Sequence, residues 1–270
     1  MYHSISDDPE PGVANYYRLC TSPAAFRQQM TFLHEHGYRT VDLDRLDTLK
    51  FVPNAQNNRL VAITFDDGFR DNLTEALPVL ERFGFTATIY LATAYVREQR
   101  TSFKGRQCLT WSEVREMRDR KVHFGSHTVN HPVLHDLQWK RIESEVRDSK
   151  SLLEDRIQAS VTSFAYPYAF PQQDALYVRR FKSLLGESGY HSAVTTTIGC
   201  VRCGDDPLAL RRLPVNTGDD LALFRAKLDG AYDWFALPQR FFKTIKHLRR
   251  HSREGRNGTY NGSAFCTYRR

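Results

Sequence analysis

Two groups of residues in this sequence have the types and spacing for metal or acid–base chemistry. Asp66 and Asp67 are adjacent carboxylates that follow the apolar run 60–63 and precede a glycine. Neighbouring acids repel each other, so we expect a bound metal, or a split between their pKa values, to keep at least one ionised. His127 and His131 follow a second strand-like segment. With this spacing they can share one cation if they lie on one side of a helical turn.

Each group alone has an ordinary structural interpretation. An Asp-Asp-Gly triplet often forms a turn that caps a helix, and two histidines four positions apart often lie on a helix surface. Here both groups lie at predicted strand ends, and such ends of one face are neighbours in a parallel barrel. Two imidazoles and one carboxylate give three ligands and leave room for water, as in a catalytic metal site. The remaining carboxylate would then be available as a general base.

An aromatic segment, Phe164-Ala165-Tyr166-Pro167-Tyr168, follows a third predicted strand. Beside a metal, a wall of aromatic rings and proline suits the apolar face of a sugar. The alternative is that these rings belong to the core at the barrel rim. That alternative has more weight for Tyr166 than for Tyr168.

The elements that must position these residues alternate between strands and helices. With 270 residues, 41% of them hydrophobic, the chain can bury one barrel-sized core. Strands that alternate with helices of this length indicate a parallel sheet with helical crossovers. No Gly-rich phosphate loop follows any predicted strand, which disfavours a nucleotide-binding sheet and favours a closed or partly closed barrel. Strands are expected near 1–5, 39–41, 60–63, 86–92, 122–125, 161–166, 191–195 and 210–215, and helices near 22–36, 43–49, 73–83, 110–120, 138–157, 174–185 and 219–234.

The net charge of +7 is concentrated in the last residues of the chain. Residues 240–270 contain nine Lys or Arg and one acid, so they carry +8 and the preceding residues sum to −1. We therefore expect a barrel domain over 1–235 and a basic C-terminal helix and tail over 236–270. The tail could touch an anionic membrane surface, but the nearly neutral body does not indicate a nucleic-acid partner. No transmembrane segment or signal peptide is visible, which predicts a cytoplasmic location.

The three segments, in this order, resemble those of the polysaccharide deacetylase family, also called the NodB-homology or carbohydrate esterase 4 family. Residues 64–68 (Thr-Phe-Asp-Asp-Gly) match its first motif and residues 126–131 (Ser-His-Thr-Val-Asn-His) its second. The Tyr-His start, 164–168 and the Leu-Arg-Arg-Leu-Pro-Val strand at 210–215 look most like bacterial members acting near exopolysaccharide or chitooligosaccharide synthesis. The resemblance implies an α/β fold, a single-domain distorted (β/α)7 barrel.

The resemblance also implies roles for particular residues. Asp66 would be the catalytic base, and Asp67, His127 and His131 would bind one divalent metal ion. We expect zinc at this site, with cobalt or nickel as alternatives. The backbone N–H of Tyr168 would face the developing oxyanion. Sites of substrate binding are expected at Tyr166, Pro167, Tyr168 and Arg212.

The chain departs from the family pattern at three places. Many members have an arginine, paired with the catalytic base, where this chain has Ala165; Arg212 could take its place. A glycine of the usual motif is replaced by Ala169. The late Leu-x-His motif that supplies the general acid is absent. His3 is the candidate for that role, because a histidine there acts as the acid in the branch that begins with Tyr-His; it could also be a structural residue.

The expected function is metal-dependent removal of acetyl groups from poly- or oligosaccharides that contain N-acetylglucosamine. One alternative is a deacetylase or esterase for another acetylated glycan, such as peptidoglycan or acetylated xylan. A second is a carbohydrate-binding protein that has kept the metal site and lost turnover, as the three departures would allow. A third is a protein that works through its basic tail. The sequence does not predict an oligomeric state.

Overall fold

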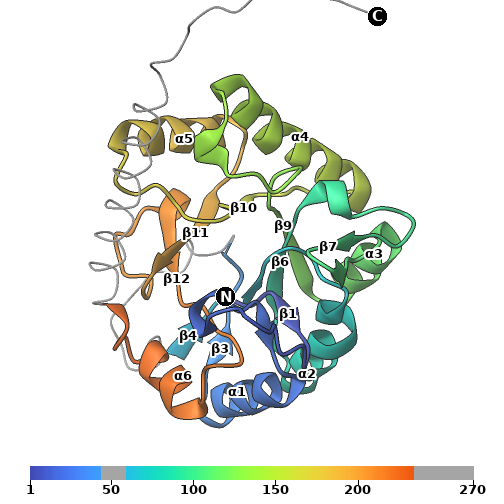
Figure 1. Ribbon diagram of the computed structural model, residues 1–270, viewed down its shortest axis with the longest axis vertical. Coiled ribbons are helices and arrows are strands. Elements are labelled where there is room, and N and C mark those ends of the chain that lie inside the picture. The colour runs from blue at the N-terminus through green and yellow to red at the C-terminus, as the bar shows by residue number, and fades with distance from the viewer. Residues whose placement is uncertain (44–58, 234–270) are drawn as a thin grey trace, which may run out of the picture.

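The computed structural model describes residues 1–43 and 59–233, and its centre is a curled parallel sheet ringed by helices (Figure 1). Six strands pair in the order β12-β11-β10-β9-β6-β5, all parallel. Their bounds are β5 (Thr64–Phe65), β6 (Ala87–Leu91), β9 (Val122–Ser126), β10 (Ser163–Ala165), β11 (Ser192–Ile198) and β12 (Leu210–Arg212). Parallel order with helical crossovers is what the predicted alternation of elements requires.

The first residues of the chain close the sheet into a ring. Tyr2 N–H donates to Thr64 O at 2.8 Å, and Asp66 N–H donates to Tyr2 O at 3.0 Å, which adds the segment to the β5 edge. At the other edge, the Met1 nitrogen donates to Leu213 O at 2.9 Å, just beyond β12. The segment continues as β1 (Ser4–Ile5), which pairs in parallel with β2 (Cys20–Thr21). The fold is thus a distorted (β/α)7 barrel in a single domain, with the first segment as its seventh strand.

Side chains alternate between the inside and the outside of this ring. On β6, Ile89 and Leu91 join the large core that packs under the helices, whereas Tyr90 belongs to a second, smaller cluster. The smaller cluster contains Ala165 and Val194 from neighbouring strands. Gly125 on β9 lies opposite Tyr90, and a Cβ there would be 2.4 Å from the Tyr90 ring. A glycine at this position therefore lets the buried tyrosine fill the interior.

Several helix ends lie where the sequence predicts, but the last helix, expected over 219–234, ends at Leu228. Ser22 accepts a hydrogen bond from Ala25 N–H at the start of the first helix, and Thr110 forms a capping box with Glu113. Gly84 ends another helix at a φ of 67°. The helices lie around the outside of the strands (Figure 1). They are α1 (Pro23–Glu35), α2 (Leu77–Phe83), preceded by a π-helical turn (Asn72–Ala76), α3 (Trp111–Asp119), α4 (Trp139–Ile157), α5 (Ala175–Glu187) and α6 (Leu221–Leu228).

Besides β1–β2, two further short pairs of strands lie outside the six-stranded sheet. β3 (Arg39–Thr40) pairs with β4 (Leu60–Val61), and an antiparallel hairpin is formed by β7 (Ser102–Phe103) and β8 (Arg106–Gln107). The sequence did not predict the hairpin. The expected helix near 43–49 falls almost wholly, and the basic tail of 236–270 wholly, outside the described residues.

Candidate metal centre and catalytic carboxylate

Asp67, His127 and His131 come together at the carboxyl ends of β5 and β9. Asp67 Oδ1 is 3.1 Å from His131 Nε2 and 3.7 Å from His127 Nε2. All three side chains are buried, and one potential ligand atom from each lies within 4.8 Å of the others. Among the described residues, this is the one group of His, Cys, Asp or Glu side chains with such geometry.

A left-handed turn directs the two adjacent carboxylates to different partners. Asp67 has a φ of 72° and Gly68 a φ of 68°, so the chain reverses sharply where β5 ends. A non-glycine residue in this region is uncommon and is found at functional sites when the surrounding structure enforces it. The turn directs Asp67 towards the histidines, while Asp66, still extended from the strand, faces Arg212.

The histidines lie on an irregular loop, so the helical turn that their spacing suggested is wrong. Thr128 and His131 both have left-handed backbones, with φ of 69° and 53°. Glu145 on α4 holds the loop, because its carboxylate accepts hydrogen bonds from the N–H groups of Val129 and Asn130 at 2.9 and 2.8 Å. The two imidazole centroids are nevertheless only 4.7 Å apart. The predicted proximity is therefore present, with a different backbone geometry.

One hydrogen bond fixes which nitrogen of His127 faces Asp67. The distance from His127 Nδ1 to Ala165 O is 2.7 Å, and a carbonyl can only accept, so Nδ1 carries the proton. Burial lowers the pKa of His127 to about 4, although the negative field of Asp66 opposes the shift. The imidazole is therefore neutral near pH 7 and presents the Nε2 lone pair to Asp67, as metal-binding histidines do.

The donor set fits a divalent cation. Within the described part of the chain, Asp67 Oδ1 is buried without a hydrogen-bond partner, and so is His131 Nδ1. A buried, unsatisfied carboxylate oxygen is costly unless a cation or a donor neutralises it. Two nitrogens and one oxygen make a ligand set suited to zinc, cobalt or nickel, with positions left for other ligands.

Asp66 forms a bidentate ion pair with Arg212 on β12. The guanidinium donates from Nη1 to Oδ1 at 2.7 Å and from Nη2 to Oδ2 at 2.8 Å. A third donor, Arg212 Nε, bonds to Thr195 O at 2.9 Å and fixes the plane of the group. Burial alone would raise the pKa of Asp66, but Arg212 holds it well below its usual range. Asp66 is therefore ionised, and a different strand provides the arginine that the resemblance placed at 165.

His3 follows directly on the segment that pairs with β5, which brings its imidazole close to both carboxylates. Burial lowers the pKa of His3, and the fields of Asp67 and Asp66 partly oppose that shift. The backbone is held in place as well, because Asn72 Nδ2 donates to His3 O at 2.8 Å. A general acid at this position would act beside the base and the metal ligands.

The aromatic segment divides into a buried and an exposed part. Tyr166 is 2% exposed, and its hydroxyl lies 3.2 Å from that of Tyr177, so its ring behaves as a core residue. Pro167 leads to Tyr168, which is 46% exposed and has its ring centroid 4.5 Å from that of His131. Tyr168 has a φ of 57°, and among the described residues its N–H has no hydrogen-bond acceptor.

Three residues near the site were missed by the sequence interpretation: Phe103, Lys104 and Glu145. The Phe103 centroid lies 5.2 Å from that of His131, on the hairpin β7–β8. Lys104 Nζ is 3.0 Å from Asp67 Oδ2. Gly105 was the available signal for a tight turn at this position. Glu145 gave no signal, because it is one of many acids on α4.

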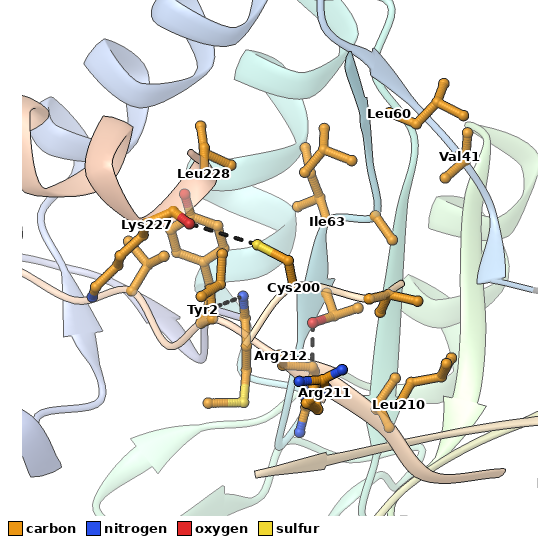
Figure 2. A pocket seen from close by; sticks show the side chains of 18 of the residues that line it. Tyr2, Val41, Leu60, Ile63, Cys200, Leu210, Arg211, Arg212, Lys227 and Leu228 are labelled. Carbon is orange, nitrogen blue, oxygen red and sulfur yellow. Dashed lines mark hydrogen bonds between the residues drawn. The ribbon is translucent and has the colours of Figure 1, made fainter. Parts of the chain in front are cut away.

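A cavity of about 420 Å³ borders the site through Arg212, and Figure 2 shows part of its lining. Ile63, Leu210 and Leu228 contribute to largely apolar walls. None of the described residues that line it is Asp, Glu or His. The cavity therefore lacks the carboxylates and imidazoles that form the candidate metal centre, which lies in the separate carboxylate and histidine cluster.

Comparisons with known proteins show similarity to polysaccharide deacetylases. A family model described as polysaccharide deacetylase matches residues 54–184, a range that includes Asp66, Asp67, His127 and His131. YxkH of Bacillus subtilis (strain 168), named as a candidate polysaccharide deacetylase, is 29% identical over 229 residues, which are 85% of this chain and 75% of that protein.

A poly-beta-1,6-N-acetyl-D-glucosamine N-deacetylase of Escherichia coli (strain K12) is 27% identical over 139 residues, 48% of this chain and 20% of that protein. Among solved structures, BC0361, a polysaccharide deacetylase from Bacillus cereus, superposes with a TM-score of 0.68 at 27% identity. The match covers 84% of this chain and 67% of that one. In the described residues, no helix is both long and apolar enough to cross a membrane.

Proposed function

We propose that the chain, which resembles polysaccharide deacetylases over residues 54–184, hydrolyses N-acetyl groups of N-acetylglucosamine-containing poly- or oligosaccharides with the help of one divalent metal ion. Asp67, His127 and His131 would hold the ion, with zinc as the first candidate. The observation that supports this most strongly is that the two adjacent carboxylates have different partners. Asp67 faces two imidazoles, whereas Asp66 is held ionised by Arg212.

A divalent cation at this site supplies Lewis-acid chemistry, which polarises the acetyl carbonyl and lowers the pKa of the attacking water. Asp66 is ionised and accepts a proton from that water as it attacks. The Tyr168 N–H faces the oxyanion that develops on the carbonyl oxygen. A protonated His3 would then donate a proton to the departing amine as the C–N bond breaks. The products are acetate and a glucosamine unit.

The side chains around the histidines suit a sugar ring. Phe103 and Tyr168 both contact the His131 ring, and Tyr168 remains exposed. Two aromatic faces beside the reacting centre can bind the apolar face of a pyranose. Because Tyr166 is buried, we assign this contact to Tyr168 and Phe103. The name of the Escherichia coli relative makes β-1,6-linked N-acetylglucosamine a substrate to test beside chitooligosaccharides.

The test is acetate release from N-acetylglucosamine oligomers of both linkages, before and after a chelator, and again after added zinc. Asp67→Asn should lose both metal and activity, because it removes a ligand charge. Asp66→Asn should keep the metal and lose activity. Asp155→Asn is the matched control, because that side chain is 72% exposed on α4. Full turnover by Asp66→Asn would disprove the assignment of the base.

The same assay separates the alternative functions. Acetate release from acetylated xylan or peptidoglycan, with none from N-acetylglucosamine oligomers, would indicate that the protein acts on another acetylated glycan. Tight oligosaccharide binding with no acetate from any substrate would indicate a carbohydrate-binding protein. The position of Arg212 beside Asp66 favours turnover over binding alone, since it supplies the cation that Ala165 cannot.

A further inference from the structure

The hairpin β7–β8 places a lysine against a predicted metal ligand. Its two-residue turn consists of Lys104 and Gly105, with φ of 50° and 78°. A turn with two left-handed residues favours Asn or Asp followed by Gly, because a longer side chain is disfavoured in that conformation. Lysine is therefore a locally unfavourable choice at this position, and the contact of its side chain with Asp67 distinguishes it from other residues with a left-handed backbone.

The hairpin is fixed to the segment that follows Asp67. Arg70 N–H donates to Gln107 O at 2.8 Å, and Leu109 N–H donates to Gly68 O at 2.9 Å. On its outer side, Arg106 forms an ion pair with Asp8 at 2.7 Å. These bonds come from two separate segments of the chain. The position of Lys104 is therefore determined by the fold and does not depend on one flexible contact.

Lys104 and the histidines bind opposite oxygens of the same carboxylate. Lys104 Nζ lies 3.0 Å from Asp67 Oδ2, whereas Oδ1 faces His127 and His131. The Asp67 side chain is 0% exposed and that of Lys104 is 27% exposed. An ion pair on the surface contributes little, but here one partner is fully buried, so its orientation and charge depend on the other.

We propose that Lys104 is a positioning residue that weakens and shapes metal binding, an inference that rests on the proposed function. By occupying Oδ2, it leaves Asp67 one oxygen for a cation. Its positive charge also remains close to the cation site, together with that of Arg212, and opposes the entry of a further positive charge. In the metal-free protein, the same ammonium group neutralises the buried Asp67. Lys104 therefore stabilises the empty site relative to the loaded one.

The test measures metal binding to the metal-stripped full chain, by titration with Zn²⁺ against a chromophoric chelator and with Co²⁺ by visible absorption. Lys104→Met should bind Zn²⁺ about tenfold more tightly, because it removes a charge near the cation at a partly exposed site. It should also weaken the Co²⁺ band per ion, because both Asp67 oxygens become available and the coordination number rises. Lys104→Gln serves as a second uncharged variant should Lys104→Met fold poorly.

Two control variants test whether the effect depends on the charge and on the position. The first keeps the charge at 104, and the second removes a lysine elsewhere. Lys104→Arg keeps the charge and should retain the wild-type affinity within about twofold. Lys121→Met removes an exposed lysine that also has a left-handed backbone, with φ of 63°, at the start of β9 away from the histidine loop. It should leave the affinity unchanged.

Unchanged or weaker Zn²⁺ binding by both uncharged variants would overturn the proposal, because a purely structural lysine gives that result when removed. If the wild type binds Zn²⁺ and releases no acetate, the proposed activity fails while the inference about Lys104 still holds. If the wild type binds no Zn²⁺, the metal site itself is disproved, and so are the proposed function and the inference about Lys104.

Discussion

Replacing Arg212 by methionine should be among the most damaging single changes in this protein. The guanidinium makes two hydrogen bonds to Asp66, at 2.7 and 2.8 Å, in a pair whose side chains are only 5% and 3% exposed. Removing one partner of a buried ion pair leaves an uncompensated charge and costs about 3–5 kcal/mol. The substitution should therefore lower the free energy of unfolding of the metal-free protein by about 3–5 kcal/mol at neutral pH.

The loss of stability should depend on pH in a direction that the structure determines. In the wild type, the pKa of Asp66 lies well below its ordinary value of 3.8, so the pair stabilises the fold above that value and the contribution disappears as the pH falls through the folded pKa. Without Arg212, burial raises the pKa of Asp66. Ionised Asp66 then destabilises the variant increasingly as the pH rises, so the deficit should shrink at about pH 5 and grow at about pH 8.

The assay is urea unfolding at both pH values. It compares the wild type with Arg212→Met, Asp66→Asn and the double variant. The double variant should lose less stability than the sum of the single variants, since no buried charge is left unpaired. Arg212→Lys keeps the charge without the bidentate geometry and should fall between wild type and Arg212→Met. A deficit independent of pH, together with additive single losses, would refute the buried-pair reasoning.

Further predictions concern the loop, the barrel interior and the metal. Glu145→Gln should lower the free energy of unfolding by about 1–3 kcal/mol, because it weakens the acceptor for the N–H groups of Val129 and Asn130; chemical denaturation measures this, and unchanged stability would contradict it. Gly125→Ala should lower stability by about 1–3 kcal/mol, because its Cβ would overlap the Tyr90 ring; an unaltered Tm would show that the ring has room to move. Chelation should lower Tm, since an ion present at about 100 times its Kd stabilises the folded state by about 2.7 kcal/mol; a scan without change would argue against the site.

The sequence alone determined the alternation of elements and the strand ends that carry chemistry. Apolar runs end at Asp66 and before His127, and parallel strands of one barrel bring such ends to a common face. Helix boundaries at Ser22, Gly84 and Thr110 could be predicted because capping is a local interaction between residues a few positions apart. The family motifs rest on equally short spacings. All these features depend on neighbours in the chain.

Only the tertiary structure decided how distant segments meet around the two carboxylates. The pairing of Arg212 with Asp66 crosses 146 positions of the chain, and the Lys104 contact with Asp67 depends on a hairpin held by hydrogen bonds to other segments. The left-handed backbone of Thr128 and His131 replaces the expected helical turn, because buried Glu145 binds the loop amides. Such contacts form between residues whose separation along the chain carries no information about their distance in space. For that reason, residue types and spacing predicted which side chains could bind a cation, whereas packing decided which atoms face it.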